Sequence, residues 1–348
     1  MKFSYISRYH TISSNAKQNE EDSFMNNQEL LQKQMWFVNQ RFGMFIHFNS
    51  ATFQFAETEI EDWEYGHENH GEQRKFPFNP KDWNPVGLDC TQWARAAKAA
   101  GMKFAALTAK HHEGFSLWPT CYTEHSVKNA TDKRDIVKEY LDAFRREGVI
   151  PGIYFSMLDL HHQIGRRKCN WEDKQFIKNQ LKELLTNYGE VPFLIIDGWN
   201  AHWGGPHYDD LPFEEIDEWV KGIQPDCLLM NISCESTLDH TDIVFYENAA
   251  GQEIEDEFSG PGASCNILTK TWFWRKSDTN MELKDADWVL QKIEDANRHN
   301  VTFLLNGAPN QNGVLDANIV NQFENIGRRF RMPNKLTSIP DNWLHRMK

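Results

Sequence analysis

The sequence lacks the short motifs and the long apolar runs that define several large protein classes. No G-x-G-x-x-G and no G-x-x-x-x-G-K-[ST] motif follows a strand-like segment, so the usual nucleotide-binding signatures are missing. Cysteine is scarce, and the six residues show neither a CxxC pair nor zinc-ribbon spacing. No window approaches the roughly 18 apolar residues of a membrane-spanning helix. We therefore expect no cofactor, no disulfide framework and no membrane partner.

Basic residues are fewer than acidic residues. The chain has 37 Lys and Arg residues against 50 Asp and Glu residues, which gives a formal net charge of −13. Because no basic stripe is present that could bind phosphates, a nucleic-acid partner is not expected. The N-terminal residues contain no apolar segment long enough for a signal peptide. As written, the chain is expected to be cytoplasmic, or periplasmic or secreted if a leader was removed.

Strand-like and helix-like segments alternate along the chain. The strand candidates are near-continuous apolar runs, as is typical of strands covered on both faces. They lie at 42–48, 104–110, 150–156, 193–198, 227–233, 243–248, 264–269 and 301–306. Amphipathic segments with recognisable ends lie at 90–100, 135–148, 173–189, 213–223, 285–298 and 316–329. No convincing helix separates the fifth strand from the sixth, or the sixth from the seventh.

This alternation predicts an α/β fold, a (β/α)8 TIM-like barrel that is irregular in its later units. An open doubly wound sheet is the competing fold, and the missing nucleotide motifs disfavour it. The barrel accounts for residues 36–330 as one catalytic domain. A polar N-terminal arm over 1–35 and a C-terminal tail over 331–348 complete the predicted division.

The residues at the C-terminal ends of the predicted strands are polar or titratable. In strand order they are His47, His111 and His112, Tyr154, Asp197, Glu247 and Asn306. The active sites of (β/α)8 barrels lie at these strand ends. Such groups converging on one rim indicate a site rather than scattered polar residues of a core.

Two of these residues are carboxylates. Asp197 ends a buried run, where a carboxylate requires either a cleft or hydrogen bonds, and the alternative is a structural cap of the next helix. Glu247 has competitors in its own loop. The same group is offered by Glu253, Glu255 and Glu257. Two carboxylates across a pocket indicate glycoside hydrolysis, in which one attacks the anomeric carbon and the other protonates the leaving oxygen.

A metal-dependent barrel hydrolase is one alternative, because a histidine pair and an aspartate can hold a metal. Adjacent side chains of a strand point to opposite faces, so His111 and His112 cannot share one metal unless the chain turns between them. No H-x-H or HExxH motif is present, and we expect no metal. A catalytically weak sugar-binding barrel, with the pocket but no working acid, is the other alternative.

Several segments together resemble one family. RFGMFIHF, LTAKHHEGFSLWPT, HSVKN, GVIPGIYFS, ELLTNYG, FLIIDGW and LLNGAPNQNGVL occur in this order. They resemble the α-L-fucosidases of glycoside hydrolase family 29 over about residues 36–330. The resemblance implies a (β/α)8-like catalytic barrel that cleaves terminal α-L-fucose from fucosylated oligosaccharides or glycoconjugates with retention, without a metal. The family's C-terminal β-sandwich is expected to be absent.

The resemblance also implies roles for individual residues. Asp197 stands at the position of the family's nucleophile, and Glu247, in YENAAG, resembles the acid/base of the branch that acts on α-1,3/4 linkages. Positions similar to the family's fucose contacts are His47, His111, His112, Tyr154, Asp62 and Trp63. Asp62 stands where the family usually has Glu. Trp274, or Trp272 in the same TWFWR segment, is expected to line the methyl side of the sugar.

Overall fold

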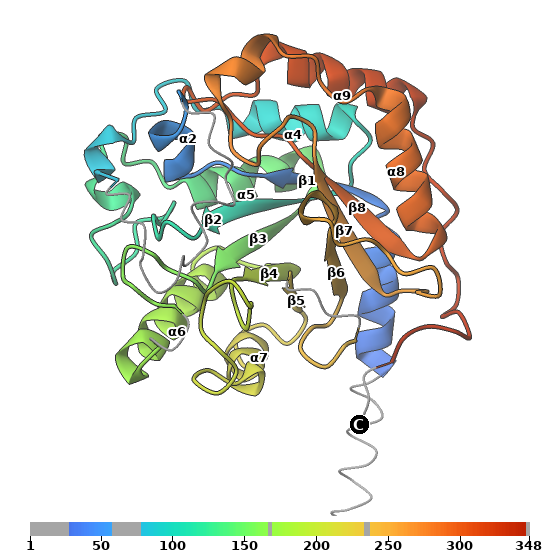
Figure 1. The fold of residues 1–348 in the computed structure, drawn as a ribbon, viewed down its shortest axis with the longest axis horizontal. Coiled ribbons are helices and arrows are strands. Elements are labelled where there is room, and N and C mark those ends of the chain that lie inside the picture. The colour runs from blue at the N-terminus through green and yellow to red at the C-terminus, as the bar shows by residue number, and fades with distance from the viewer. Residues whose placement is uncertain (1–27, 58–77, 166–168, 233–236, 346–348) are drawn as a thin grey trace, which may run out of the picture.

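Eight parallel strands curve around a common interior in the computed structural model, which describes residues 28–57, 78–165, 169–232 and 237–345 (Figure 1). The strands are β1 (Phe42–Ile46), β2 (Phe104–Lys110), β3 (Ile150–Ser156), β4 (Phe193–Asp197), β5 (Leu228–Asn231), β6 (Val244–Glu247), β7 (Gly262–Ile267) and β8 (Val301–Asn306). Hydrogen-bonded neighbours follow the order β5-β4-β3-β2-β1-β8-β7-β6. The predicted (β/α)8 barrel is confirmed as a nearly closed barrel.

The apolar residues of each strand divide between the two faces of the sheet. In β4, Phe193 and Ile195 belong to the cluster that fills the barrel interior, together with Phe45 of β1. Leu194 and Ile196 belong to the larger cluster between the strands and the helices. Because side chains alternate along a strand, both clusters are filled only if every position is apolar. This explains the near-continuous apolar runs of the sequence.

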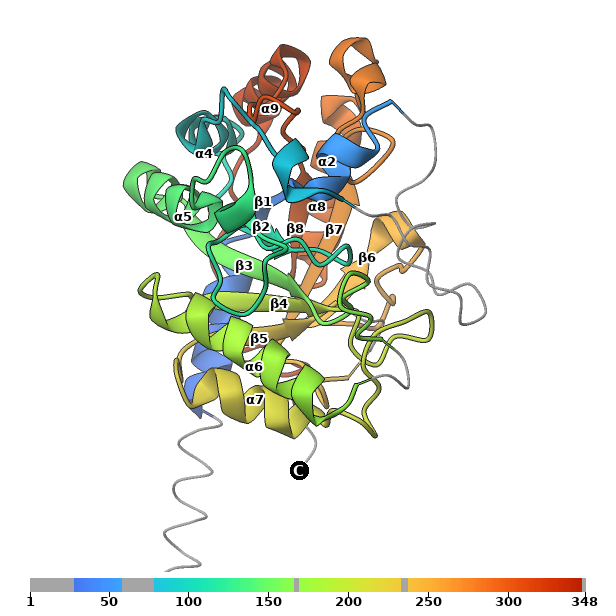
Figure 2. The same ribbon diagram turned by 90° about the vertical axis from the view of Figure 1, so that its left-hand side faces the viewer.

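Helices cover the outside of the barrel (Figures 1 and 2). They are α2 (Ser50–Gln54), α4 (Cys90–Ala99), α5 (Ile136–Glu147), α6 (Trp171–Thr186), α7 (Phe213–Lys221), α8 (Ala286–Arg298) and α9 (Ala317–Arg329). Asp135 caps α5 by accepting a hydrogen bond from the backbone N–H of Lys138, and Gly148 ends the helix at φ 75°. In the part of the chain that the structure describes, no helix is both long and apolar enough to cross a membrane.

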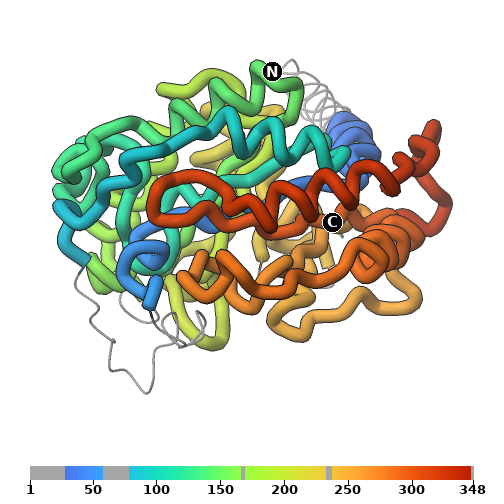
Figure 3. Tube along the Cα trace, turned by 90° about the horizontal axis from the view of Figure 1, so that it is seen from above, coloured from blue at the N-terminus to red at the C-terminus, as the bar shows by residue number. Residues whose placement is uncertain are grey.

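The ring of helices closes where the last one meets the first ones. Seen from above, α4, α9 and α8 run side by side (Figure 3), and α9 contacts both neighbours. The helix after the last strand therefore lies beside the helix that follows β1. Because the strands of the barrel are parallel, their carboxyl ends lie at one end of the molecule.

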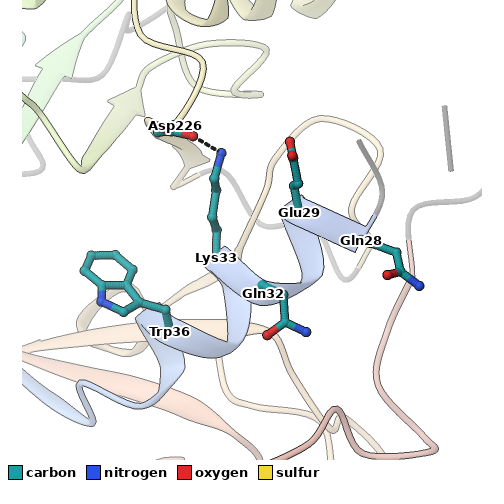
Figure 4. Close-up of a pocket in the computed structure, with 6 residues that line it drawn as sticks. All are labelled: Gln28, Glu29, Gln32, Lys33, Trp36 and Asp226. Carbon is teal, nitrogen blue, oxygen red and sulfur yellow. Dashed lines mark hydrogen bonds and ion pairs between the residues drawn. The ribbon is translucent and has the colours of Figure 1, made fainter. Parts of the chain in front are cut away.

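A helix over residues 28–38 closes the opposite end of the barrel. The ring of Phe37 lies 5.0 Å from that of Phe104 and 5.4 Å from that of Phe193, at the starts of β2 and β4. Figure 4 shows a hollow between this helix and Asp226, whose carboxylate pairs with Lys33. This hollow is remote from the strand carboxyl ends. The division of the chain into arm, catalytic domain and tail stays a prediction.

Candidate active site

The carboxyl ends of the strands bring the predicted polar residues to one rim. His47 follows β1, His111 and His112 follow β2, and Tyr154 lies in β3. Asp197, Glu247 and Asn306 are the last residues of β4, β6 and β8. Their arrangement follows from the parallel sheet, because all strands end at the same side. Asp62 and Trp63 lie outside the described residues, and their predicted contacts stay predictions.

Asp197 is nine-tenths buried and surrounded by hydrogen-bond donors. The hydroxyl of Tyr154 donates to its Oδ2 at 2.6 Å, and the backbone N–H of Gly198 donates to its Oδ1 at 2.6 Å. The Nε2 of His112 lies 3.6 Å from Oδ2. Burial raises the pKa of Asp197, whereas Tyr154, the charge of His111 and Gly198 lower it. These donors stabilise the carboxylate form in a place that water reaches poorly.

Glu247 is partly buried at the end of β6 and is biased toward the protonated form. Burial and, to a lesser extent, the charge of Asp197 raise its pKa to about 8, although His111 opposes both effects. The two carboxyl groups therefore lie close enough for one charge to disfavour the other. The competing Glu253, Glu255 and Glu257 are exposed on the following loop. The site thus combines Asp197, which accepts two hydrogen bonds, with Glu247, whose raised pKa favours the protonated form.

His111 and His112 lie beside the same group of rim residues because the chain turns after β2. The strand ends at Lys110, and Gly114 adopts φ 81° within the turn. The two imidazole rings lie 4.2 Å apart, and the ring of His111 stacks on that of Tyr154 at 5.7 Å. The sequence alone did not show whether the chain turns between the two histidines. The turn lets adjacent histidines serve one site.

His47 lies between the aromatic residues of the rim. Its ring is 4.7 Å from Trp272 and 5.3 Å from Phe273, and its Nδ1 lies 2.8 Å from Oδ1 of Asn306. Burial and the charge of His111 together hold the pKa of His47 well below 6.5, although the hydrogen bond with Asn306 acts in the opposite direction. The ring is therefore neutral at neutral pH.

The two tryptophans of the TWFWR segment have different surroundings. Trp272 packs beside His47, whereas Trp274 directs its indole N–H to Oδ2 of Asp316 at 2.7 Å. Trp274 also packs with Ala56 and Ala308. The structure therefore brings Trp272 to the histidines, and the predicted sugar contact of Trp274 stays a prediction.

A buried ion pair beneath the rim was missed at the sequence level. Nζ of Lys110 lies 3.1 Å from Oδ2 of Asp159, and both side chains are fully buried. Lys110 also donates to Gln180 of α6, and Asp159 accepts from the backbone and ring nitrogens of His162. The one signal in the sequence is a lysine that ends an apolar strand just before the histidine pair. The pair ties the β2 loop to the β3 loop.

The chemistry of the rim is that of acids, bases and hydrogen bonds. Within the described ranges, no group of three or more His, Cys, Asp or Glu side chains could hold a metal ion. Two carboxyl groups with different surroundings, together with three histidines and a tyrosine, can bind a polyhydroxylated ligand and transfer a proton to it.

Comparison with known proteins points to one group of enzymes. The family model described as Alpha-L-fucosidase matches residues 11–333. Alpha-L-fucosidase 1 from Arabidopsis thaliana is 28% identical over 309 residues, covering 82% of this chain and 57% of its own length. Putative alpha-L-fucosidase 1 from Oryza sativa subsp. japonica is 27% identical over 314 residues, covering 82% of this chain and 56% of its own length. The chain thus spans little more than half of these relatives.

A solved structure agrees with these sequence matches. Alpha-L-fucosidase isoenzyme 1 from Paenibacillus thiaminolyticus superimposes with a TM-score of 0.70 at 26% identity, over 86% of this chain and 76% of that one.

Proposed function

We propose that this chain, which belongs to the alpha-L-fucosidase family, is a retaining exo-α-L-fucosidase that removes terminal α-L-fucose from fucosylated glycans. One observation carries the proposal. Asp197 accepts two hydrogen bonds, while the pKa of Glu247, at the same rim, is raised to about 8. A retaining glycosidase needs this division between a nucleophilic carboxylate and a carboxylic acid.

In the first step, a carboxylate oxygen of Asp197 attacks C1 of the fucosyl group. The bond between C1 and the leaving oxygen breaks, and the proton of Glu247 passes to that oxygen. The products are a covalent fucosyl-enzyme ester and the free aglycone. The hydroxyl of Tyr154, 2.6 Å from Oδ2 of Asp197, holds the attacking carboxylate in place.

In the second step, Glu247, now ionised, takes a proton from a water molecule that attacks C1 from the face the aglycone left. The ester bond to Asp197 breaks and fucose leaves with its original configuration. For this double displacement, we predict that the two carboxyl groups lie about 5–5.5 Å apart in a ligand-bound state.

The remaining rim residues are proposed to bind the sugar. His47, His111, His112 and Tyr154 would hydrogen-bond its hydroxyl groups, with Asp62 and Trp63 completing the set. Trp274 or Trp272 would cover the methyl side. A preference for α-1,3/4 linkages is the finer part of the proposal and is supported by the resemblance of YENAAG to the acid/base segment of that branch.

The test is hydrolysis of an activated aryl α-L-fucoside and of a fucosylated oligosaccharide, each with and without EDTA. Asp197→Ala should lose activity on both substrates by about a thousandfold or more. Glu247→Ala should lose about 10²–10⁴-fold on the oligosaccharide and much less on the aryl fucoside, whose leaving group needs little protonation. Azide should restore turnover of Glu247→Ala on the aryl substrate and give the α-fucosyl azide.

Glu253→Ala is the matched control, because this exposed glutamate lies in the same loop. If Glu247→Ala hydrolyses the oligosaccharide like the unmodified protein, Glu247 is not the acid. Fucose binding without turnover would indicate the sugar-binding barrel instead, and a loss of activity in EDTA would indicate a metal-dependent enzyme.

A further inference from the structure

Asn306 is oriented by two contacts at the end of β8. Its Nδ2 donates to the backbone carbonyl of Trp272 at 2.7 Å, and its Oδ1 lies 2.8 Å from Nδ1 of His47. A carbonyl accepts only, so the amide group must turn its nitrogen to Trp272 and its oxygen to His47. An amide oxygen also accepts only. The proton of the His47 ring therefore lies on Nδ1.

The surroundings of His47 exclude a second proton. The residue is only 4% exposed and its ring is enclosed by those of Phe45, Trp272 and Phe273 at 4.6, 4.7 and 5.3 Å. An imidazolium would be poorly solvated there, and the charge of His111 also opposes it. A neutral ring with its proton on Nδ1 has a lone pair on Nε2. Among the described residues, no hydrogen bond reaches that nitrogen.

We infer that Asn306 is a positioning residue that fixes the tautomer of His47, so that His47 accepts a hydrogen bond from a sugar hydroxyl and does not donate one. The identity of the sugar rests on the proposed function, whereas the tautomer does not. The consequence for specificity is that the sugar hydroxyl in contact with Nε2 of His47 must donate a hydrogen bond. Fluorine at that position is rejected as strongly as hydrogen, because neither can donate.

The first experiment reads the tautomer directly. In protein labelled with ¹⁵N-histidine, the two ring nitrogens of His47 are assigned by the signals that disappear in His47→Gln. We expect a protonated Nδ1 and an unprotonated Nε2, which resonates far downfield. Asn306→Asp keeps an acceptor and should keep the proton on Nδ1, whereas Asn306→Leu should move it toward Nε2. Asn266→Leu, at the end of the neighbouring β7, is the matched control and should leave the His47 signals unchanged.

A proton on Nε2 of His47 in the unmodified protein would overturn the inference. So would unchanged His47 signals in Asn306→Leu. The measurement on the unmodified protein decides the question even if Asn306→Leu does not fold. Neither reading requires that the protein bind fucose, so a failure of the inference can be told apart from a failure of the proposed function.

The second experiment uses free L-fucose and its monodeoxy and monodeoxyfluoro analogues at C2, C3 and C4 as competitive inhibitors of aryl fucoside hydrolysis. Inhibition is measured instead of turnover because fluorine also slows bond breaking at C1. At one position, both replacements should weaken binding to a similar extent, by roughly tenfold. Asn306→Leu should weaken L-fucose by a similar factor but add little to the loss for those two analogues. If fluorine is accepted better than hydrogen at every position, or if Asn306→Leu weakens all ligands equally, the inference fails.

Discussion

At the scale of single residues, the surroundings of the two carboxyl groups at the rim act differently on their charged forms. Asp197 is stabilised as an anion by Tyr154 and Gly198, and its charge helps to keep Glu247 protonated. The two groups influence each other's titration, so replacing one of them should shift the apparent pKa of the other. The pH dependence of the protein should report this coupling both in catalysis and in stability.

We predict a bell-shaped dependence of kcat/KM on pH. Activity should rise as Asp197 ionises, above its usual range because burial raises its pKa, and fall near pH 8 as Glu247 loses its proton. Glu247→Gln should lose the alkaline limb on an activated aryl fucoside, because no acid remains to titrate. The measurement is kcat/KM from about pH 4 to 10 for both proteins. An alkaline limb that persists near pH 8 in Glu247→Gln would assign it to another group.

The raised pKa of Glu247 also predicts how the stability of the protein changes with pH. The pKa of Glu247 is about 8 in the folded protein against an ordinary 4.5, so folding takes up a proton between these values. The contribution of Glu247 to the free energy of unfolding is therefore most favourable below pH 4.5, and it is lost as the pH rises through 8. Glu247→Gln should therefore match the unmodified protein at about pH 4 and exceed it by on the order of 1–3 kcal/mol at about pH 9. Urea unfolding at both pH values measures this, and the exposed Glu253→Gln should show no such trend.

At the scale of elements, the strands could be predicted from the sequence and the loops could not. Seven of the eight predicted strand segments contain the observed strand, because strands covered on both faces consist of nearly consecutive apolar residues. The remaining one is shifted: β7 begins at Gly262, two residues before the predicted 264. Its first residues are small, with Gly262 followed by Ala263, and carry little apolar signal.

The rim residues were predictable for a topological reason, whereas their supporting contacts were not. Parallel strands end at one side, so polar strand ends such as Asp197 and Asn306 had to meet. Nothing in the local pattern relates Lys110 to Asp159, which lies 49 residues further along the chain. The turn that brings His111 and His112 together depends on such contacts. A Cβ on Gly114 would lie 2.1 Å from Oδ1 of Asp159, so this carboxylate also requires glycine there.

The buried pair makes a prediction about the two loops. Lys110→Met should destabilise the protein by about 3–5 kcal/mol, because it leaves the carboxylate of Asp159 buried and unpaired by a cation. Lys110→Met combined with Asp159→Leu should recover part of this loss, since no isolated charge remains. Urea unfolding of both variants and of Asp159→Leu gives the coupling energy. The exposed pair of Lys138 and Asp142 on α5 is the control and should contribute less than about 1 kcal/mol. Additive losses for Lys110 and Asp159 would contradict the prediction.

At the scale of the whole molecule, the barrel is closed between β5 and β6 by a few hydrogen bonds, most of them to side chains. In the part of the chain that the structure describes, no strand ladder joins β5 to β6, and β5 pairs with β4 alone. Thr241 and Asp242, just before β6, link the two strands instead, and the backbone N–H of Asp242 donates to the carbonyl of Leu229 at 2.7 Å. The backbone N–H of Leu229 donates to Oδ2 of Asp242 at 2.8 Å, and that of Asn231 donates to Oγ1 of Thr241 at 3.1 Å.

Asp242 also joins this junction between β5 and β6, which we call the seam, to the two elements that cover it. Its Oδ2 accepts from Nζ of Lys221 in α7 at 2.6 Å, and its backbone carbonyl accepts from Gln34 of the helix over 28–38 at 2.8 Å. The residue is 1% exposed. A single side chain therefore satisfies a backbone donor of β5, neutralises a lysine and fixes the segment that leads into β6 and Glu247.

We predict that Asp242→Ala opens the seam. It leaves the N–H of Leu229 buried without an acceptor and Lys221 without its carboxylate, which together should cost about 2–4 kcal/mol of unfolding free energy. Backbone amides of β5 and β6 should exchange with solvent faster than those of β2 and β3, which are paired on both sides. Asp239→Ala, an exposed aspartate in the same connection, should change neither quantity. Hydrogen exchange followed by mass spectrometry resolves these segments. Unchanged protection of β5 in Asp242→Ala would mean that packing and the backbone hydrogen bond from residue 242 to Leu229 hold the barrel closed there, and not this carboxylate.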